Sequence, residues 1–178
     1  MRLGGADGIR AVTIGEGGPL CVVAGPCVLE STELAQEICA GLVQACGALG
    51  LQLVFKASFD KANRTSVAGL RGPGLAEGLD MLSAVRERFG VPVTTDVHLP
   101  NQVPEVASKV DLLQVPAFLC RQTDLLQACG RSGRPVNIKK GQFQAPWDMA
   151  GAVDKVRSAG GTAVMVTERG STFGYNNL

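Results

Sequence analysis

The runs LQLVFKA (residues 51–57) and VPVTTD (residues 91–96) decide the fold. Between them, Leu75–Phe89 places apolar side chains at three- and four-residue steps, directly after the helix breaker Gly-Pro-Gly at residues 72–74. Two short apolar runs separated by an amphipathic helix predict parallel strands joined by that helix. We interpret residues 51–96 as one strand–helix–strand unit of an α/β protein.

The same alternation continues along the chain. Apolar runs at residues 20–24, 112–115, 136–139 and 163–167 bring the predicted strands to six, and shorter helical patterns cover residues 101–109, 122–130 and 147–159. An open doubly wound sheet or a closed barrel would suit this pattern. No GxGxxG follows the first run, and polar residues cluster where runs end, which favours a barrel with its site at the carboxyl ends of the strands. These residues are Lys56, Ser58, Asp96, His98, Gln114, Lys139, Lys140, Glu168 and Arg169.

The first helix is expected to begin near Ser31, whose hydroxyl can cap free backbone N–H groups. Its apolar stripe is predicted at Leu34, Ile38, Leu42, Ala45 and Leu49. The six cysteines of the chain form no CxxC pair, so we expect reduced thiols. Two of them, seven residues apart in this helix, are interpreted as small buried apolar groups; they are Cys39 and Cys46.

A TIM (β/α)8 barrel has eight strands and about 250 residues. The sequence therefore predicts one barrel domain over residues 1–178, truncated after its sixth strand. Residues 11–18 alternate and end in Gly-Glu-Gly-Gly, which indicates an N-terminal β-hairpin extension over residues 1–19.

Composition excludes several function classes. The 17 Lys and Arg residues nearly balance 16 Asp and Glu, and aromatic residues make up 4% of the chain, so a nucleic-acid partner is not expected. No apolar run approaches the ~20 residues of a membrane span. We expect a cytoplasmic protein that does not enter the membrane.

The segment FKASFDKANRTS (residues 55–66) combines basic residues with hydroxyls after a strand, which indicates an anion site, phosphate above all. Taken alone, it is also typical of a solvated loop. Further cations at other strand ends, Lys139, Lys140 and Arg169, would converge on the same barrel mouth. Asp96 and Gln114 are candidates for orienting hydroxyls or a water.

Ordered motifs add a resemblance to a known family. They are AGPC (24–27) with ES (30–31), FKASFDKANRTS (55–66), RGPGL (71–75), TDVH (95–98), QVPAFLCRQTD (114–124), NIKKGQF (137–143) and TERG (167–170) with FGY (173–175). Together they closely resemble 3-deoxy-D-manno-octulosonate 8-phosphate synthases. A related family, 3-deoxy-D-arabino-heptulosonate 7-phosphate synthases, typically carries Lys-Pro-Arg-Thr in the sugar loop. Asn63 stands in place of that proline and favours arabinose 5-phosphate over erythrose 4-phosphate.

The resemblance implies a transferase that joins phosphoenolpyruvate to D-arabinose 5-phosphate with water, releasing phosphate by C–O cleavage, in lipopolysaccharide precursor synthesis. By analogy, Lys61, Asn63, Asp96 and Lys139 are the catalytic residues. Phosphoenolpyruvate would be held by Lys61, Lys139 and Arg169, helped by Ser58, Gln114 and the backbone at Ala117, with Lys56 beside them. Arabinose 5-phosphate would be held by Asn63, Arg64 and Thr65.

The resemblance also implies a metal and an oligomer. Family members with cysteine at the position of Cys27 form a metal-dependent class, and a thiolate suits Fe, Mn or Zn. The other three family ligands, a His, a Glu and an Asp, are expected beyond Leu178, so His98 is interpreted as structural. Without the resemblance, Cys27 would be read as a buried structural thiol. Arg121 is expected to reach a neighbouring subunit's site, usually in a homotetramer.

Two alternatives stay open. One is the heptulosonate relative, which would turn over erythrose 4-phosphate. The other is a non-catalytic partial barrel that binds phosphorylated ligands or a partner chain without turnover.

Overall fold

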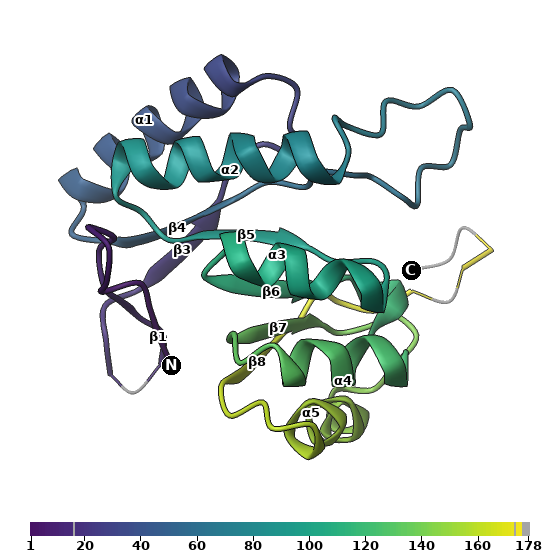
Figure 1. The fold of residues 1–178 in the computed structure, drawn as a ribbon. Coiled ribbons are helices and arrows are strands. Elements are labelled where there is room, and N and C mark those ends of the chain that lie inside the picture. The colour runs from purple at the N-terminus through teal and green to yellow at the C-terminus, as the bar shows by residue number, and fades with distance from the viewer. Residues whose placement is uncertain (16, 173, 176–178) are drawn as a thin grey trace. The chain divides into compact units, whose positions relative to one another are not determined.

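The computed structural model describes residues 1–15, 17–172 and 174–175 (Figure 1). The chain divides into two compact units. The first unit comprises Met1–Thr95 with Ser108–Leu112, and the second comprises Asp96–Ala107 with Leu113–Leu178. Glu16 of the predicted hairpin, Phe173 of the last motif and residues 176–178 lie outside the described residues.

The strands of both units follow chain order. In the first unit β3 (Cys21–Ala24), β4 (Gln52–Lys56) and β5 (Val93–Asp96) pair in parallel; in the second, β6 (Leu112–Val115), β7 (Val136–Lys139) and β8 (Val164–Thr167) do the same. Each strand lies inside its predicted run. Neither unit shows the strand-order reversal that marks an open doubly wound sheet, so the α/β topology of a (β/α) barrel is confirmed over these strands.

The first unit packs two helices on its strands. Helices α1 (Thr32–Ala48) and α2 (Leu75–Phe89) lie next to each other (Figure 1). The α2 bounds equal the predicted ones, and Gly90 ends the helix in the left-handed conformation, as a glycine does readily. The core is fully buried, with Val54, Phe55, Leu82 and Val85 among its side chains.

Helix α1 begins as predicted but buries a different face. The Ser31 Oγ accepts a hydrogen bond from the Leu34 N–H at 3.1 Å. The predicted stripe is wrong, because Leu34 is 36% exposed and Leu49 72% exposed. Close packing on α2 and β4 instead selects the face with small side chains: Ala35, Cys39 and Cys46. Both cysteines are buried as predicted, and burial raises the pKa of Cys39 to about 11.

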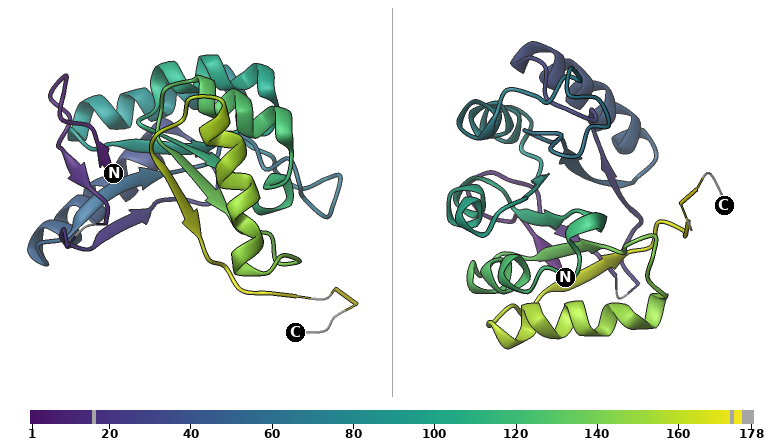
Figure 2. Two further views of the ribbon diagram at one scale, coloured as in Figure 1. Left: turned by 90° about the horizontal axis from the view of Figure 1, so that it is seen from below. Right: turned by 90° about the vertical axis from the view of Figure 1, so that its right-hand side faces the viewer.

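The second unit repeats the pattern. Helix α3 (Val103–Lys109) follows a 3-10 turn at Pro100–Gln102, α4 (Thr123–Arg131) follows one at Ala117–Leu119, and α5 (Met149–Ser158) follows one at Pro146–Asp148. Helices α4 and α5 lie side by side (Figure 2). Gly130 permits this approach, since a side chain there would overlap the Val156 carbonyl oxygen.

The predicted N-terminal hairpin within residues 1–19 is confirmed, but its connection lies earlier in the chain than residues 11–18 indicated. Strand β1 (Arg2–Leu3) pairs antiparallel with β2 (Val12–Thr13), so the connection spans residues 4–11. The Gly18 N–H donates separately to the Gly15 carbonyl. The hairpin is fixed to the first unit: the Gln52 side chain exchanges two hydrogen bonds with the Thr13 backbone, and the Arg10 N–H donates to the Gly90 carbonyl. The single domain over residues 1–178 stays a prediction.

Candidate active site

In the first unit, the AGPC turn and the FKASFDKANRTS segment lie together. A side chain on Gly25 would overlap the Lys56 carbonyl oxygen, so glycine is what allows the end of β3 to pass close to the end of β4. A parallel bridge joins Val28 to Ser58, and the Leu29 N–H donates to the Ser58 carbonyl at 3.0 Å. These backbone contacts hold the motif of Cys27 beside Lys56 and Ser58.

Two ammonium groups meet on one hydroxyl at the end of β4. The Lys56 Nζ donates to the Ser58 Oγ at 3.2 Å, and the Lys61 Nζ donates to the same oxygen at 2.8 Å. Ser58 is fully buried, while both lysines are half-buried. Like charges this close repel each other, so an anion bound between them would be stabilised.

The predicted sugar residues lie on an exposed loop that follows this cluster and extends past the start of α2 (Figure 1). The base of the loop is closed by Asp60, which accepts two hydrogen bonds from Arg71. Asn63, Arg64 and Thr65 are exposed. The Arg64 Nε donates to a carbonyl within the loop at 3.0 Å, and within the described ranges no other hydrogen bond of this guanidinium is found.

In the second unit, Asp96 lies against the only histidine of the chain. The His98 Nε2 is 2.9 Å from the Asp96 Oδ2, and both side chains are largely buried. The Gln102 side chain holds this segment by accepting hydrogen bonds from the His98 and Leu99 N–H groups. The His98 ring thus orients the Asp96 carboxylate, which agrees with the structural role expected for it.

A chain of polar side chains crosses β6, β7 and β8, with Gln114 and Asn137 buried and Thr167 half-buried. The Thr167 hydroxyl donates to the Asn137 Oδ1 at 2.8 Å, and the Asn137 amide donates to the Gln114 Oε1 at a longer 3.4 Å. The Gln114 oxygen is thus engaged, and among the described residues no acceptor is found for its amide N–H groups. Sequence reasoning assigned no role to Asn137 or Thr167. A polar residue inside the apolar run 136–139 was the signal for the first of them.

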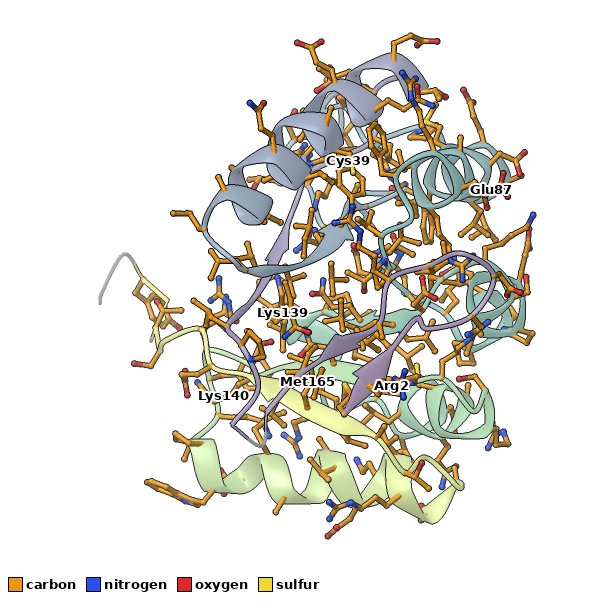
Figure 3. The ribbon with its side chains drawn as sticks, turned by 90° about the vertical axis from the view of Figure 1, so that its left-hand side faces the viewer. Arg2, Cys39, Glu87, Lys139, Lys140 and Met165 are labelled. Atoms are coloured by element: carbon orange, nitrogen blue, oxygen red, sulfur yellow. The ribbon has the colours of Figure 1, made fainter. Side chains whose placement is uncertain are left out.

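Lys139, the last residue of β7, and Lys140, which follows it, lie in different surroundings (Figure 3). Lys139 is half-buried, and the described part of the chain offers its ammonium no hydrogen bond or ion pair. Lys140 is 3% exposed and donates to the carbonyls of Gly141, Gln144 and Gly170 at 2.8–3.1 Å. The expectation that Lys140 joins the anion-binding cations is therefore wrong, because its hydrogen-bonding capacity is used internally.

Arg169 is exposed, with its backbone held by the preceding residue. The Glu168 carboxylate accepts hydrogen bonds from the N–H groups of Arg169 and Gly170 and pairs with Lys140 at 3.3 Å. Desolvation raises the pKa of the Glu168 carboxyl. The two N–H groups and the ammonium outweigh this effect, so the pKa lies below its usual value.

Ala117 begins the 3-10 turn after β6, and Arg121 follows that turn. Arg121 is exposed, and its carbonyl accepts a hydrogen bond from Lys155 at 2.9 Å. Its predicted reach into a neighbouring subunit stays a prediction.

The metal expectation rests on one residue. The Cys27 thiol is exposed, not buried, so it is open to a ligand. Among the residues that the structure describes, no three or more His, Cys, Asp or Glu side chains gather as a metal site. These residues therefore do not by themselves fit a metal centre. Nor is any described helix both long and apolar enough to cross a membrane.

Fold and site together define a parallel α/β protein with cationic and polar side chains at the ends of its strands. The profile of the DAHP synthetase I family matches residues 6–178, so the chain belongs to this family.

Similar curated proteins are named 2-dehydro-3-deoxyphosphooctonate aldolase. The protein from Desulfotalea psychrophila is 54% identical over 167 residues, covering 94% of this chain and 60% of the relative. The protein from Syntrophotalea carbinolica is 56% identical over 170 residues, 96% and 61% of the two chains. The protein from Fusobacterium nucleatum is 57% identical over 157 residues, 88% and 56%. The chain thus spans about three fifths of the length of these relatives.

Proposed function

We propose that the protein carrying this chain condenses phosphoenolpyruvate with D-arabinose 5-phosphate and water to give 3-deoxy-D-manno-octulosonate 8-phosphate and inorganic phosphate. The names of the similar proteins support this reaction. The observation that carries it is the pair of ammonium groups, Lys56 and Lys61, on the buried Ser58 hydroxyl. Such a cluster suits a substrate that brings a phosphate and a carboxylate.

Phosphoenolpyruvate is the proposed ligand of the cationic residues. Lys61, Lys139 and Arg169 hold its phosphate and carboxylate, with help from Lys56, Ser58, Gln114 and the backbone of Ala117. The engaged oxygen of Gln114 supports a donor role for this amide. Fixed cations stabilise the charges that form as the C–C bond is made and phosphate leaves by C–O cleavage.

The sugar phosphate is the proposed ligand of Asn63, Arg64 and Thr65. Their exposure on the loop supports a role with a substrate that arrives from solvent. Asp96, oriented by His98, acts near the sugar aldehyde. We therefore propose four catalytic residues: Lys61, Asn63, Asp96 and Lys139.

The proposals on the metal, the oligomer and the cellular location rest on the family resemblance. Cys27 is proposed as one ligand of a divalent Fe, Mn or Zn ion, whose other ligands come from the rest of the protein. The enzyme is proposed to be a cytoplasmic homotetramer in which Arg121 serves the neighbouring site. Metal content of the purified protein tests the first assignment: Cys27→Ala should lose a stoichiometric metal, and equal metal in both forms contradicts it.

The reaction is tested by inorganic phosphate release. It should require phosphoenolpyruvate and arabinose 5-phosphate together. Arg169→Ala should lower kcat/KM by roughly a hundred-fold or more, the loss typical of a charge-stabilising group. Arg131→Ala, which removes an exposed arginine from the end of α4, is the matched control and should leave turnover unchanged. Retained turnover in Arg169→Ala would refute its role.

A second candidate is the condensation with erythrose 4-phosphate. The description of the family, DAHP synthetase I, favours it. Asn63 in the sugar loop favours the five-carbon sugar, and Asn63→Pro should shift relative kcat/KM toward erythrose 4-phosphate. Equal turnover of both sugars by the unchanged protein would move the assignment to the condensation with erythrose 4-phosphate. Binding of both substrates without turnover would support the non-catalytic alternative.

A further inference from the structure

Lys140 is a buried, hydrogen-bonded cation of the second unit that the proposed reaction does not use. Its ammonium lies 2.8 Å from the Gly170 carbonyl and 3.1 Å from the carbonyls of Gly141 and Gln144. The Glu168 carboxylate lies 3.3 Å from the same nitrogen. An ammonium has three hydrogens, and here three carbonyl oxygens accept them.

These contacts tie together two loops that follow neighbouring strands. Gly141 and Gln144 belong to the loop after β7, while Glu168 and Gly170 belong to the segment after β8. The Lys140 N–H also donates to the Thr167 carbonyl at 2.9 Å, which continues the pairing of β7 and β8 past the end of both strands. The ammonium is thus the centre of a small assembly built from both loops.

Arg169 lies in the middle of that assembly. The Glu168 carboxylate accepts hydrogen bonds from the N–H of Arg169 at 2.9 Å and from that of Gly170 at 2.7 Å. Lys140 holds the carbonyl on the far side, at Gly170. The backbone is therefore fixed before and after Arg169, which sets the point from which this exposed side chain leaves the chain.

The charges of the assembly cancel locally. Lys140 pairs with Glu168, so the positive charges left at these strand ends are those of Lys139 and Arg169. A buried ammonium needs such partners, because removing a charge from water is costly unless it is paired and hydrogen-bonded. Lys140 therefore cannot turn to a substrate anion without giving up its hydrogen bonds to three carbonyls and its pairing with Glu168.

We propose that Lys140 is a positioning residue, which binds the loops after β7 and β8 through three carbonyls and Glu168 and thereby places Arg169 for the anionic substrate. The part concerning substrate rests on the proposed function; the part concerning the loops does not.

Removal and chemical replacement of the ammonium test this role. In the complete protein, Lys140→Ala leaves a space lined by the same oxygens, and a free ammonium ion has the charge and the hydrogens to fill it. In sodium chloride, amide hydrogen exchange at Arg169 and Gly170 should quicken by about ten-fold, and KM for phosphoenolpyruvate should rise by about ten-fold. In ammonium chloride of equal ionic strength, both values should return several-fold toward the unchanged protein.

The control is Lys109→Ala, which removes an exposed lysine at the end of α3 and should change neither value. Wild-type exchange and KM in Lys140→Ala would overturn the proposal. Changes that do not respond to ammonium would overturn it too, because they would indicate a general loss of packing or a direct substrate contact.

Should Lys140→Ala fail to fold, Glu168→Gln supplies the milder variant. It keeps an oxygen for the N–H groups but removes the charge, so exchange at Arg169 and Gly170 should quicken by about three-fold. Unchanged exchange there would overturn the proposal. If the unchanged protein releases no phosphate, the proposed reaction fails and the exchange measurements alone decide the role of Lys140.

Discussion

Lys61 in the first unit and Lys140 in the second both follow the end of a strand, yet their surroundings differ. The Lys61 ammonium donates to a hydroxyl, and none of the ion pairs found among the described residues includes it. The Lys140 ammonium is buried among three carbonyls and a carboxylate. Lysine thus provides an open charge in the first unit, an ammonium outside any of these ion pairs. In the second unit it provides a closed charge, a buried ammonium whose hydrogens are all taken by nearby acceptors.

Loss of the open charge should have the largest effect on activity. Lys61→Ala is expected to lower kcat/KM for phosphate release by roughly a thousand-fold, because a cation aimed at a developing anion acts strongly where water is limited. Its unfolding midpoint in urea should stay near that of the unchanged protein. Activity within a few-fold of normal would show that Lys61 is not an open charge used in catalysis.

Carboxylates of the first unit extend the same contrast to stability. Asp111 is 4% exposed and accepts hydrogen bonds from Arg86 and from the Val93 N–H. Asp111→Ala should lower the free energy of unfolding by about 3–5 kcal/mol, since it leaves the half-buried Arg86 guanidinium and the buried Val93 N–H without this acceptor. Asp60→Ala breaks the more exposed pair with Arg71 and should cost less than about 1 kcal/mol. Urea denaturation measures both losses of unfolding free energy. Equal losses in the two variants would show that the buried pair is no more stabilising than the exposed one.

The polar chain of the second unit should show a smaller effect. Thr167→Val removes the donor to Asn137 and leaves its oxygen unpaired, which should lower the free energy of unfolding by about 1–3 kcal/mol. Thr167→Ser keeps the hydroxyl and is the matched control. If valine and serine behave alike in urea denaturation, the hydrogen bond does not contribute.

The smallest predicted effect is a pH dependence. The pKa of Glu168 is lowered in the folded protein, so its contribution to stability is present above the unfolded pKa and is lost as pH falls through the folded value. Glu168→Gln should therefore flatten the decline of the melting temperature between neutral and acid pH. If the melting temperature of Glu168→Gln falls with pH as steeply as that of the unchanged protein, the Glu168 carboxylate does not stabilise the Lys140 assembly.

Much of the fold follows from periodicity. Every described strand of the parallel set lies inside an apolar run, and α2 has its predicted bounds, because Gly-Pro-Gly and Gly90 mark both of its ends. For α1, the burial of Cys39 and Cys46 was predicted but the leucine stripe was wrong, since packing against α2 selected small residues over leucines. Likewise, the N-terminal pairing depends on a distant partner, Gln52, which no local pattern reveals.

The candidate site was less predictable than the fold. The lysines around Ser58 stand within one motif, so proximity in sequence brought them together. Without the family resemblance, Lys139 and Lys140 could not be told apart, because adjacent lysines look alike until the acceptors from the following loops are placed. Asn137 and Thr167 were missed for the same reason: their bond joins two strands thirty residues apart.

The proposed condensation is tested most directly by following the oxygen that bridges carbon and phosphorus in phosphoenolpyruvate. With that oxygen replaced by oxygen-18, the mass of the released phosphate reports which bond breaks. We predict that phosphate appears only when arabinose 5-phosphate is present and that it carries the label, as C–O cleavage requires. Unlabelled phosphate, or labelled phosphate released without the sugar, would contradict the proposed reaction.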